Sequence, residues 1–248
     1  MPVFDALLLA AAAFFAGILN TVAGGGTFLT FPALVFTGVP VVAANATSAV
    51  AVFPGYLGGA VGFRREIAAF ERNRLLRILL ATAAGGLIGS LLLLVSSNRA
   101  FSVVVPFLLL IATLAFAFGD RLQAWAQRSR LAEGWMGTVL VSIYGGYFNG
   151  GLGIVLLALF AMWGMRDLNA MNGLKNALSF VLSAISVATF AAAGIVAWPQ
   201  ALLMMAAAML GGYAGAPLAR ALPRQVVRGT VIGVGAVTSV IFFARLFG

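Results

Sequence analysis

The feature that most constrains this chain is an internal repeat, in which two stretches about 127 residues apart carry the same signals within apolar surroundings. In each stretch a glycine cluster precedes a short apolar run, and a long apolar segment with two polar residues near its start follows. Glycine-broken apolar segments at matching positions of two halves are typical of membrane transporters and indicate where the binding site lies. The matched residues are Gly24, Gly25, Gly26, Asn45 and Ser48 in the first stretch and Gly150, Gly151, Gly153, Asn172 and Lys175 in the second.

A second glycine pattern is also repeated, and we expect it to form ridges through which helices pack, since small residues let helix backbones approach closely. Chance agreement in a chain rich in alanine, leucine and glycine is one alternative to a true repeat. The two copies of this pattern are Gly85, Gly86 and Gly89, and Gly211, Gly212 and Gly215.

The composition is that of a membrane protein. Charged residues make up 8% of the 248 residues and apolar residues 62%, and the mean hydropathy is +1.09. Soluble domains carry about 25% charged residues. Without Cys or His, the chain cannot form disulfides or the usual Cys/His metal sites. Since it also lacks any evident nucleophile–base pair, we expect no enzyme activity, no metal and no cofactor.

The net charge of +9 comes from 15 basic residues that lie mainly in short connectors between apolar segments. This pattern is typical of cytoplasmic loops beside an anionic leaflet. We therefore expect the lipid bilayer as a partner, and no nucleic acid.

The apolar runs predict an all-α polytopic protein with five elements in each half. The second run of each half is too short for the roughly 20 residues that a spanning helix needs, which indicates a re-entrant element. We expect a first membrane repeat at 1–119, a cytoplasmic linker at 120–134 and a second membrane repeat at 135–248. The runs lie at 5–23, 27–37, 41–63, 75–97, 101–119, 135–149, 152–164, 170–193, 199–219 and 229–247.

The arginines predict the orientation. No Lys or Arg precedes Arg64, and the connectors that follow 41–63 and 101–119 are rich in arginine. If the basic connectors are cytoplasmic, both termini face outward and the two repeats are inverted, because each contains an odd number of elements. Two parallel halves are the alternative, and Arg99 in an outer turn is the single exception to the rule.

The glycine clusters predict broken helices within the membrane. Non-helical backbone survives at that depth only where protein or a water-filled cavity satisfies it. Such breaks expose N–H groups and the positive ends of helix dipoles, which suit a bound anion. The alternative is that these glycines only allow close helix packing.

The polar residues that follow the glycines form matching patches, because residues three apart share a helix face. Asn45 pairs with Ser48, and Asn172 pairs with Lys175. Lys175 lies roughly 10–12 Å into its segment at 1.5 Å per residue, and a charge at such depth indicates a function. The alternative is a lysine that reaches back to the membrane surface.

No acidic residue lies deep in an apolar segment. This argues against a proton relay and against a carboxylate-based sodium site. A deep lysine without an acidic partner is consistent with a bound anion, which concentration and membrane potential could drive outward. We expect Tyr56 and Tyr144 to serve at the interface or in packing.

Taken together, these motifs resemble the sulfite exporter family of the TauE/SafE type. The resemblance covers essentially the whole chain. It implies an anion transporter of about eight helices in a bacterial cytoplasmic membrane, with Gly24–Gly26, Gly150, Gly151, Gly153, Asn172 and Lys175 along the path; Asn45 and Ser48 come from the repeat alone. The motifs are the run Gly24–Pro32, Ala44–Ser48, Gly150–Gly153, Leu168–Asn176 and Gly194–Trp198.

The sequence therefore favours an exporter of a small sulfur-containing anion such as sulfite or an organosulfonate. Two rival hypotheses are a structural or assembly membrane protein that transports nothing, and a permease for another solute or ion. The cargo, the oligomeric state and the driving ion are left open by residues of such generic chemistry.

Overall fold

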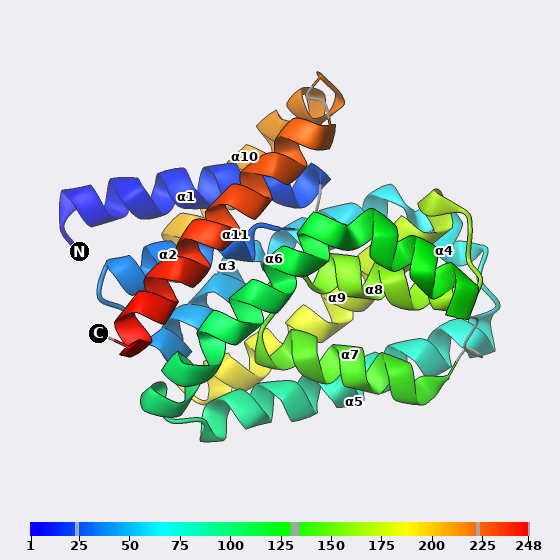
Figure 1. Ribbon diagram of the computed structural model, residues 1–248, viewed down its shortest axis with the longest axis horizontal. Coiled ribbons are helices and arrows are strands. Elements are labelled where there is room, and N and C mark those ends of the chain that lie inside the picture. The colour runs from blue at the N-terminus through cyan, green and yellow to red at the C-terminus, as the bar shows by residue number, and fades with distance from the viewer. Residues whose placement is uncertain (23–24, 130–133, 222–223, 248) are drawn as a thin grey trace.

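The computed structural model describes residues 1–22, 25–129, 134–221 and 224–247, which form eleven helices and no strand (Figure 1). Both short apolar runs of the sequence appear as short helices, α2 and α8. The helices are α1 (Val3–Val22), α2 (Thr27–Phe36), α3 (Val41–Gly62), α4 (Arg64–Ala68), α5 (Arg72–Val95), α6 (Asn98–Ser129), α7 (Trp135–Tyr147), α8 (Leu152–Met162), α9 (Leu168–Ala192), α10 (Trp198–Ala221) and α11 (Arg224–Phe247).

The structure confirms the prediction of an all-α membrane protein. Within the described ranges, α1, α3, α5, α6 and α9 each contain a segment long and apolar enough to cross a bilayer, whereas α2 and α8 are apolar but shorter. Large apolar side chains are exposed on the outer faces of the helices, as a lipid-facing surface requires. α6 continues through 120–129, so this part of the expected linker is helical.

The helices repeat in order, and their contacts repeat with them. Helices α1, α2, α3, α5 and α6 correspond to α7, α8, α9, α10 and α11, and α4 is an addition to the first half. α1 packs along α10, and its counterpart α7 packs along α5. α3 packs against its own counterpart α9, and α6 against α11. Such reciprocal contacts are expected when a two-fold axis relates two halves.

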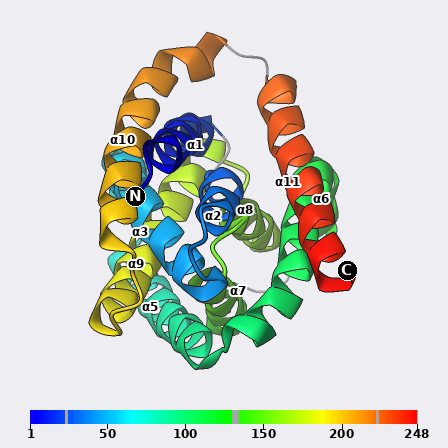
Figure 2. The ribbon, with the colours of Figure 1, turned by 90° about the vertical axis from the view of Figure 1, so that its left-hand side faces the viewer.

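The ends of the helices give the direction of each half. Figure 1 shows both termini at one end of the molecule, whereas α6 ends and α7 begins at the opposite end, and Figure 2 looks along this long axis from the side of the termini. α1 and α7 therefore start from opposite ends, which is the relation that an inverted repeat predicts. Which end faces the cytoplasm stays a prediction.

Glycines bring the paired helices into close contact, as the second glycine pattern predicts. A methyl group built on Gly89 of α5 would meet backbone atoms of Ile143, Gly146 and Tyr147 in α7. In the other half, one built on Gly211 of α10 would meet the backbone of Phe14 in α1. The surroundings of Gly215 lie outside the described part of the structure.

We expect Gly89→Ala to lower the free energy of unfolding by about 1–3 kcal/mol, because the new methyl group can be accommodated only if a helix backbone moves. The matched control is Gly233→Ala in α11, where a methyl group would meet nothing within 4 Å and should be neutral or stabilising. Thermal unfolding in detergent, followed by tryptophan fluorescence, measures both. Equal melting temperatures would contradict the close packing of α5 on α7.

Candidate functional site

The two short helices are about half as long as the hydrocarbon core of a membrane is thick. α2 has 10 residues and α8 has 11, so each is roughly 15–17 Å long at 1.5 Å per residue. The hydrocarbon core is about 30 Å thick. A helix of this length that ends near one surface begins about halfway across the bilayer, where its first N–H groups lack helical partners.

The start of α2 is fixed by polar side chains of its own half. Gly25 and Gly26 are buried, and the Gly26 N–H donates to Asn20 Oδ1 at 2.8 Å. Thr30 Oγ1 donates to the Gly26 carbonyl at 3.2 Å and lies 2.6 Å from Ser48 Oγ of α3. Ser48 is thus next to the first turn of α2. Gly24 lies outside the described residues.

The start of α8 requires a glycine. Gly151 precedes the helix with a φ of +73°, a conformation that side-chain-bearing residues rarely adopt. Gly150, Gly151 and Gly153 are all buried. The Ile154 N–H donates to the Gly151 carbonyl at 3.0 Å. Within the described part of the chain, the neighbouring N–H of Gly153 has no protein acceptor.

Three side chains form hydrogen bonds with the loop before α8, and two of them come from the other half of the chain. Asn45 Nδ2 of α3 donates to the Tyr147 carbonyl at 2.9 Å. The Tyr56 hydroxyl, also on α3, donates to Asn149 Oδ1 at 3.4 Å. The third is the Tyr144 hydroxyl of α7, which donates to the Gly150 carbonyl. Asn45 therefore hydrogen-bonds to the second hairpin, which consists of α7, α8 and the loop between them.

Lys175 lies against the start of α8. Its ammonium group donates to Asn172 Oδ1 at 3.1 Å, one turn earlier on α9. A methyl group built on Gly153 would lie 3.4 Å from Lys175 Cδ, so the lysine chain runs along the first turn of α8. The structure thus brings together Lys175, Asn172 and Gly153, three residues that the sequence singled out.

The two polar patches do not meet each other. A methyl group built on Gly59 of α3 would lie 2.7 Å from Asn176 Cγ, next to Lys175 on α9. Ser48 precedes Gly59 by 11 residues, or about 16 Å along α3. Ser48 therefore serves the start of α2 and Lys175 the start of α8, at separate levels.

Several residues at these hairpins were not predicted as site residues. Tyr56 and Tyr144 were expected at the interface or in packing, yet both hold the loop before α8. Asn20 and Asn149 adjoin the glycine clusters in the sequence, and their position beside the glycines could have identified them as site residues. No local sequence pattern predicts the role of the two tyrosines. Their hydrogen-bond partners depend on how α3 packs and on the conformation of the loop before α8.

A cluster of aromatic rings anchors α2 against the second half. Phe31 of α2 is fully buried. Its ring packs edge-on against Phe148, in the loop before α8, at a centroid distance of 5.8 Å. It also stacks on Phe242 of α11 at 5.6 Å. The two hairpins are therefore joined by apolar contacts, whereas the hydrogen bonds to the loop before α8 that come from the first half of the chain start from α3.

Comparison with known proteins gives a consistent family assignment. The model of the family "Sulfite exporter TauE/SafE" matches residues 9–242. A "Probable membrane transporter protein" of Haemophilus influenzae is 29% identical over 223 residues, covering 88% of this chain and 87% of the relative. A "Probable membrane transporter protein YfcA" of Escherichia coli K12 is 25% identical over 241 residues, covering 92% and 85%. No solved structure matches the chain.

Two neighbouring glycines should respond differently to alanine. Gly151→Ala forces a side chain into a left-handed conformation, and we expect it to lower stability by about 1–2 kcal/mol. Gly153→Ala adds only an ordinary contact with Lys175 and should leave stability within about 1 kcal/mol of wild type. Thermal unfolding of the two purified variants tests this. A Gly151→Ala protein as stable as Gly153→Ala would contradict the loop conformation.

Proposed function

The chain belongs to the sulfite exporter TauE/SafE family, and from that premise we propose that it exports a small sulfur-containing anion, such as sulfite or an organosulfonate, across the bacterial cytoplasmic membrane. The observation that carries this proposal is the contact between Lys175 and the first turn of α8. A cation and a helix N-terminus meet there, inside a segment that crosses the membrane.

The groups at this point suit an oxyanion. A helix N-terminus carries partial positive charge and presents N–H groups that bind sulfate-like or carboxylate groups. An ammonium group has three donors, of which Asn172 takes one. Because Gly153 has no side chain, an anion can approach its N–H closely. We infer that the anion binds between the Lys175 ammonium and the first turn of α8.

An acidic side chain, Glu66, packs against the helix that carries Lys175, but at a different face of that helix. Glu66 of α4 packs near Gly173, where a methyl group would lie 3.4 Å from Glu66 Cβ. Residues two apart on a helix point to different sides, and Lys175 instead contacts Gly153. A charge in the membrane interior is costly unless it is paired, so a bound anion would compensate Lys175.

The first hairpin, which consists of α1, α2 and the chain between them, would hold the anion more weakly than the second. Around the start of α2 the described side chains are the neutral Thr30, Ser48 and Asn20. Passage through a membrane protein requires sites that bind but also release. With the orientation that the arginines predict, the charged site lies toward the cytoplasm and the neutral one toward the exterior. A membrane potential negative inside supplies about 2.3 kcal/mol per charge and 100 mV for export.

We expect Lys175→Met to reduce voltage-driven sulfite flux at least about tenfold, since it removes the charge that attracts the anion. The assay is sulfite flux in proteoliposomes under an imposed voltage and no pH gradient. The matched control is Arg166→Gln, which removes an exposed positive charge just before α9 and should leave flux near wild type.

Other outcomes would count against the proposal. Wild-type flux in a folded Lys175→Met protein would remove Lys175 from the path and favour a permease for cations or neutral solutes. If the wild type carries neither sulfite nor an organosulfonate, the proposed cargo is wrong. A Lys175→Met protein that only loses stability would favour a structural role.

A further inference from the structure

A polar pocket lies apart from the site proposed at Lys175. A pocket of about 370 Å³ opens between the first turns of α5 and α7, at the end of the molecule opposite the termini (Figure 1). Arg74, Arg77 and Glu71 line it from the α5 side, and Thr138 and Trp135 from α7. The path through Lys175 does not involve any of these residues.

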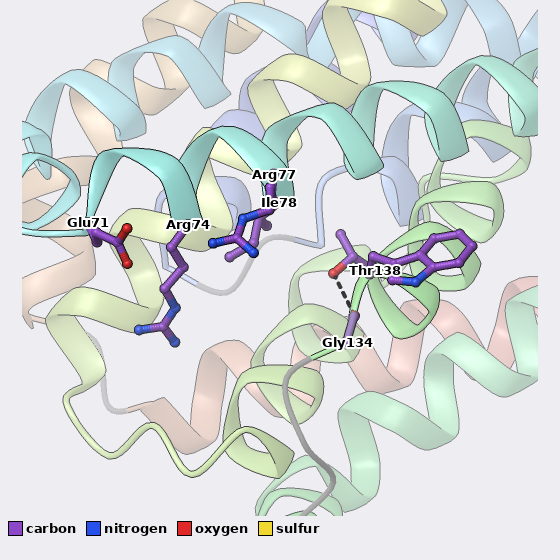
Figure 3. Close-up of a pocket in the computed structure, with 7 residues that line it drawn as sticks. Glu71, Arg74, Arg77, Ile78, Gly134 and Thr138 are labelled. Atoms are coloured by element: carbon purple, nitrogen blue, oxygen red, sulfur yellow. Dashed lines mark hydrogen bonds between the residues drawn. The ribbon is translucent and has the colours of Figure 1, made fainter.

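Two arginines line the pocket from the same face of α5. Arg74 and Arg77 are three residues apart, so they share a helix face, and Figure 3 shows both guanidinium groups extending from α5 on the same side. Arg74 lies over the Phe70 ring at 5.8 Å. Arg77 Nε donates to the Asn73 carbonyl at 3.3 Å. Planar guanidinium groups match phosphate oxygens in geometry and charge.

The charge balance indicates a singly charged ligand. Two guanidinium groups and the Glu71 carboxylate give the pocket a formal net charge of about +1. A phosphodiester carries one negative charge, whereas free inorganic phosphate near neutral pH carries between one and two. The pocket is thus best matched to the phosphodiester of a lipid headgroup.

Apolar side chains are also exposed on α5 and α7. Leu76 and Leu80 of α5 are 52% and 60% exposed, and Met136 and Leu140 of α7 are 64% and 62% exposed. Both pairs are four residues apart, so each forms an apolar row along its helix. Trp135, 73% exposed beside the pocket, is of the type that sits at headgroup level. An exposed tryptophan beside the pocket is consistent with a lipid headgroup at this level.

We propose that this pocket binds the headgroup of an anionic phospholipid, with its phosphate between Arg74 and Arg77. Basic pockets between helices at the cytoplasmic side of a membrane protein bind such headgroups. This site is independent of the transported anion.

The test is native mass spectrometry of the purified, delipidated full chain titrated with phosphatidylglycerol or with phosphatidylethanolamine. Arg77→Gln should weaken phosphatidylglycerol binding about fivefold, the effect of one basic residue near a lipid surface. The matched control is Arg65→Gln, an exposed arginine of α4 outside the pocket, which should leave binding unchanged. Arg77 is itself exposed, so its substitution should not disturb folding.

Three results would overturn the proposal. Equal losses in Arg77→Gln and Arg65→Gln would mean a diffuse surface charge effect. Equal binding of the two lipids by wild type would mean that the anionic headgroup is not recognised. Displacement of bound phosphatidylglycerol by millimolar inorganic phosphate would identify the occupant as a free anion.

Discussion

The structure depends on one constraint: backbone groups that leave a helix inside a membrane must find partners within the protein. At both helix breaks, side chains form hydrogen bonds with these backbone groups. Asn20 caps the Gly26 N–H. In the second half, Asn45 and Tyr56 reach across from α3 to the loop before α8. Because α3 belongs to the first half of the chain, the conformation of the second hairpin depends on hydrogen bonds from that half.

The two halves have their helices in the same order, but the side chains beside their helix breaks differ in charge. Corresponding positions carry Ser48 beside α2 and Lys175 beside α8, so one short helix starts at a neutral patch and the other at a cation. The two helix breaks are similar in their order of elements and differ in the side chain beside them. The proposed path exploits that difference, with one strong site and one weak site in series.

Much of the fold follows from sequence pattern, and part of the site does not. The runs at 27–37 and 152–164 predicted the short helices Thr27–Phe36 and Leu152–Met162 within a few residues, because length and apolarity act locally. Glycine ridges were predictable for the same reason. The position of Ser48 relative to Lys175 along the helices depends on how α3 and α9 are aligned. Only tertiary packing sets that alignment. The tyrosine contacts at the second hairpin have the same origin.

The central claim is that an anion binds between Lys175 and the first turn of α8, and calorimetric titration of sulfite into the purified protein tests it most directly. The account predicts one saturable site in the wild type, unchanged in Arg166→Gln and weakened at least about tenfold in a folded Lys175→Met protein, a loss of about 1.4 kcal/mol or more. Equal affinity in wild type and Lys175→Met would contradict it.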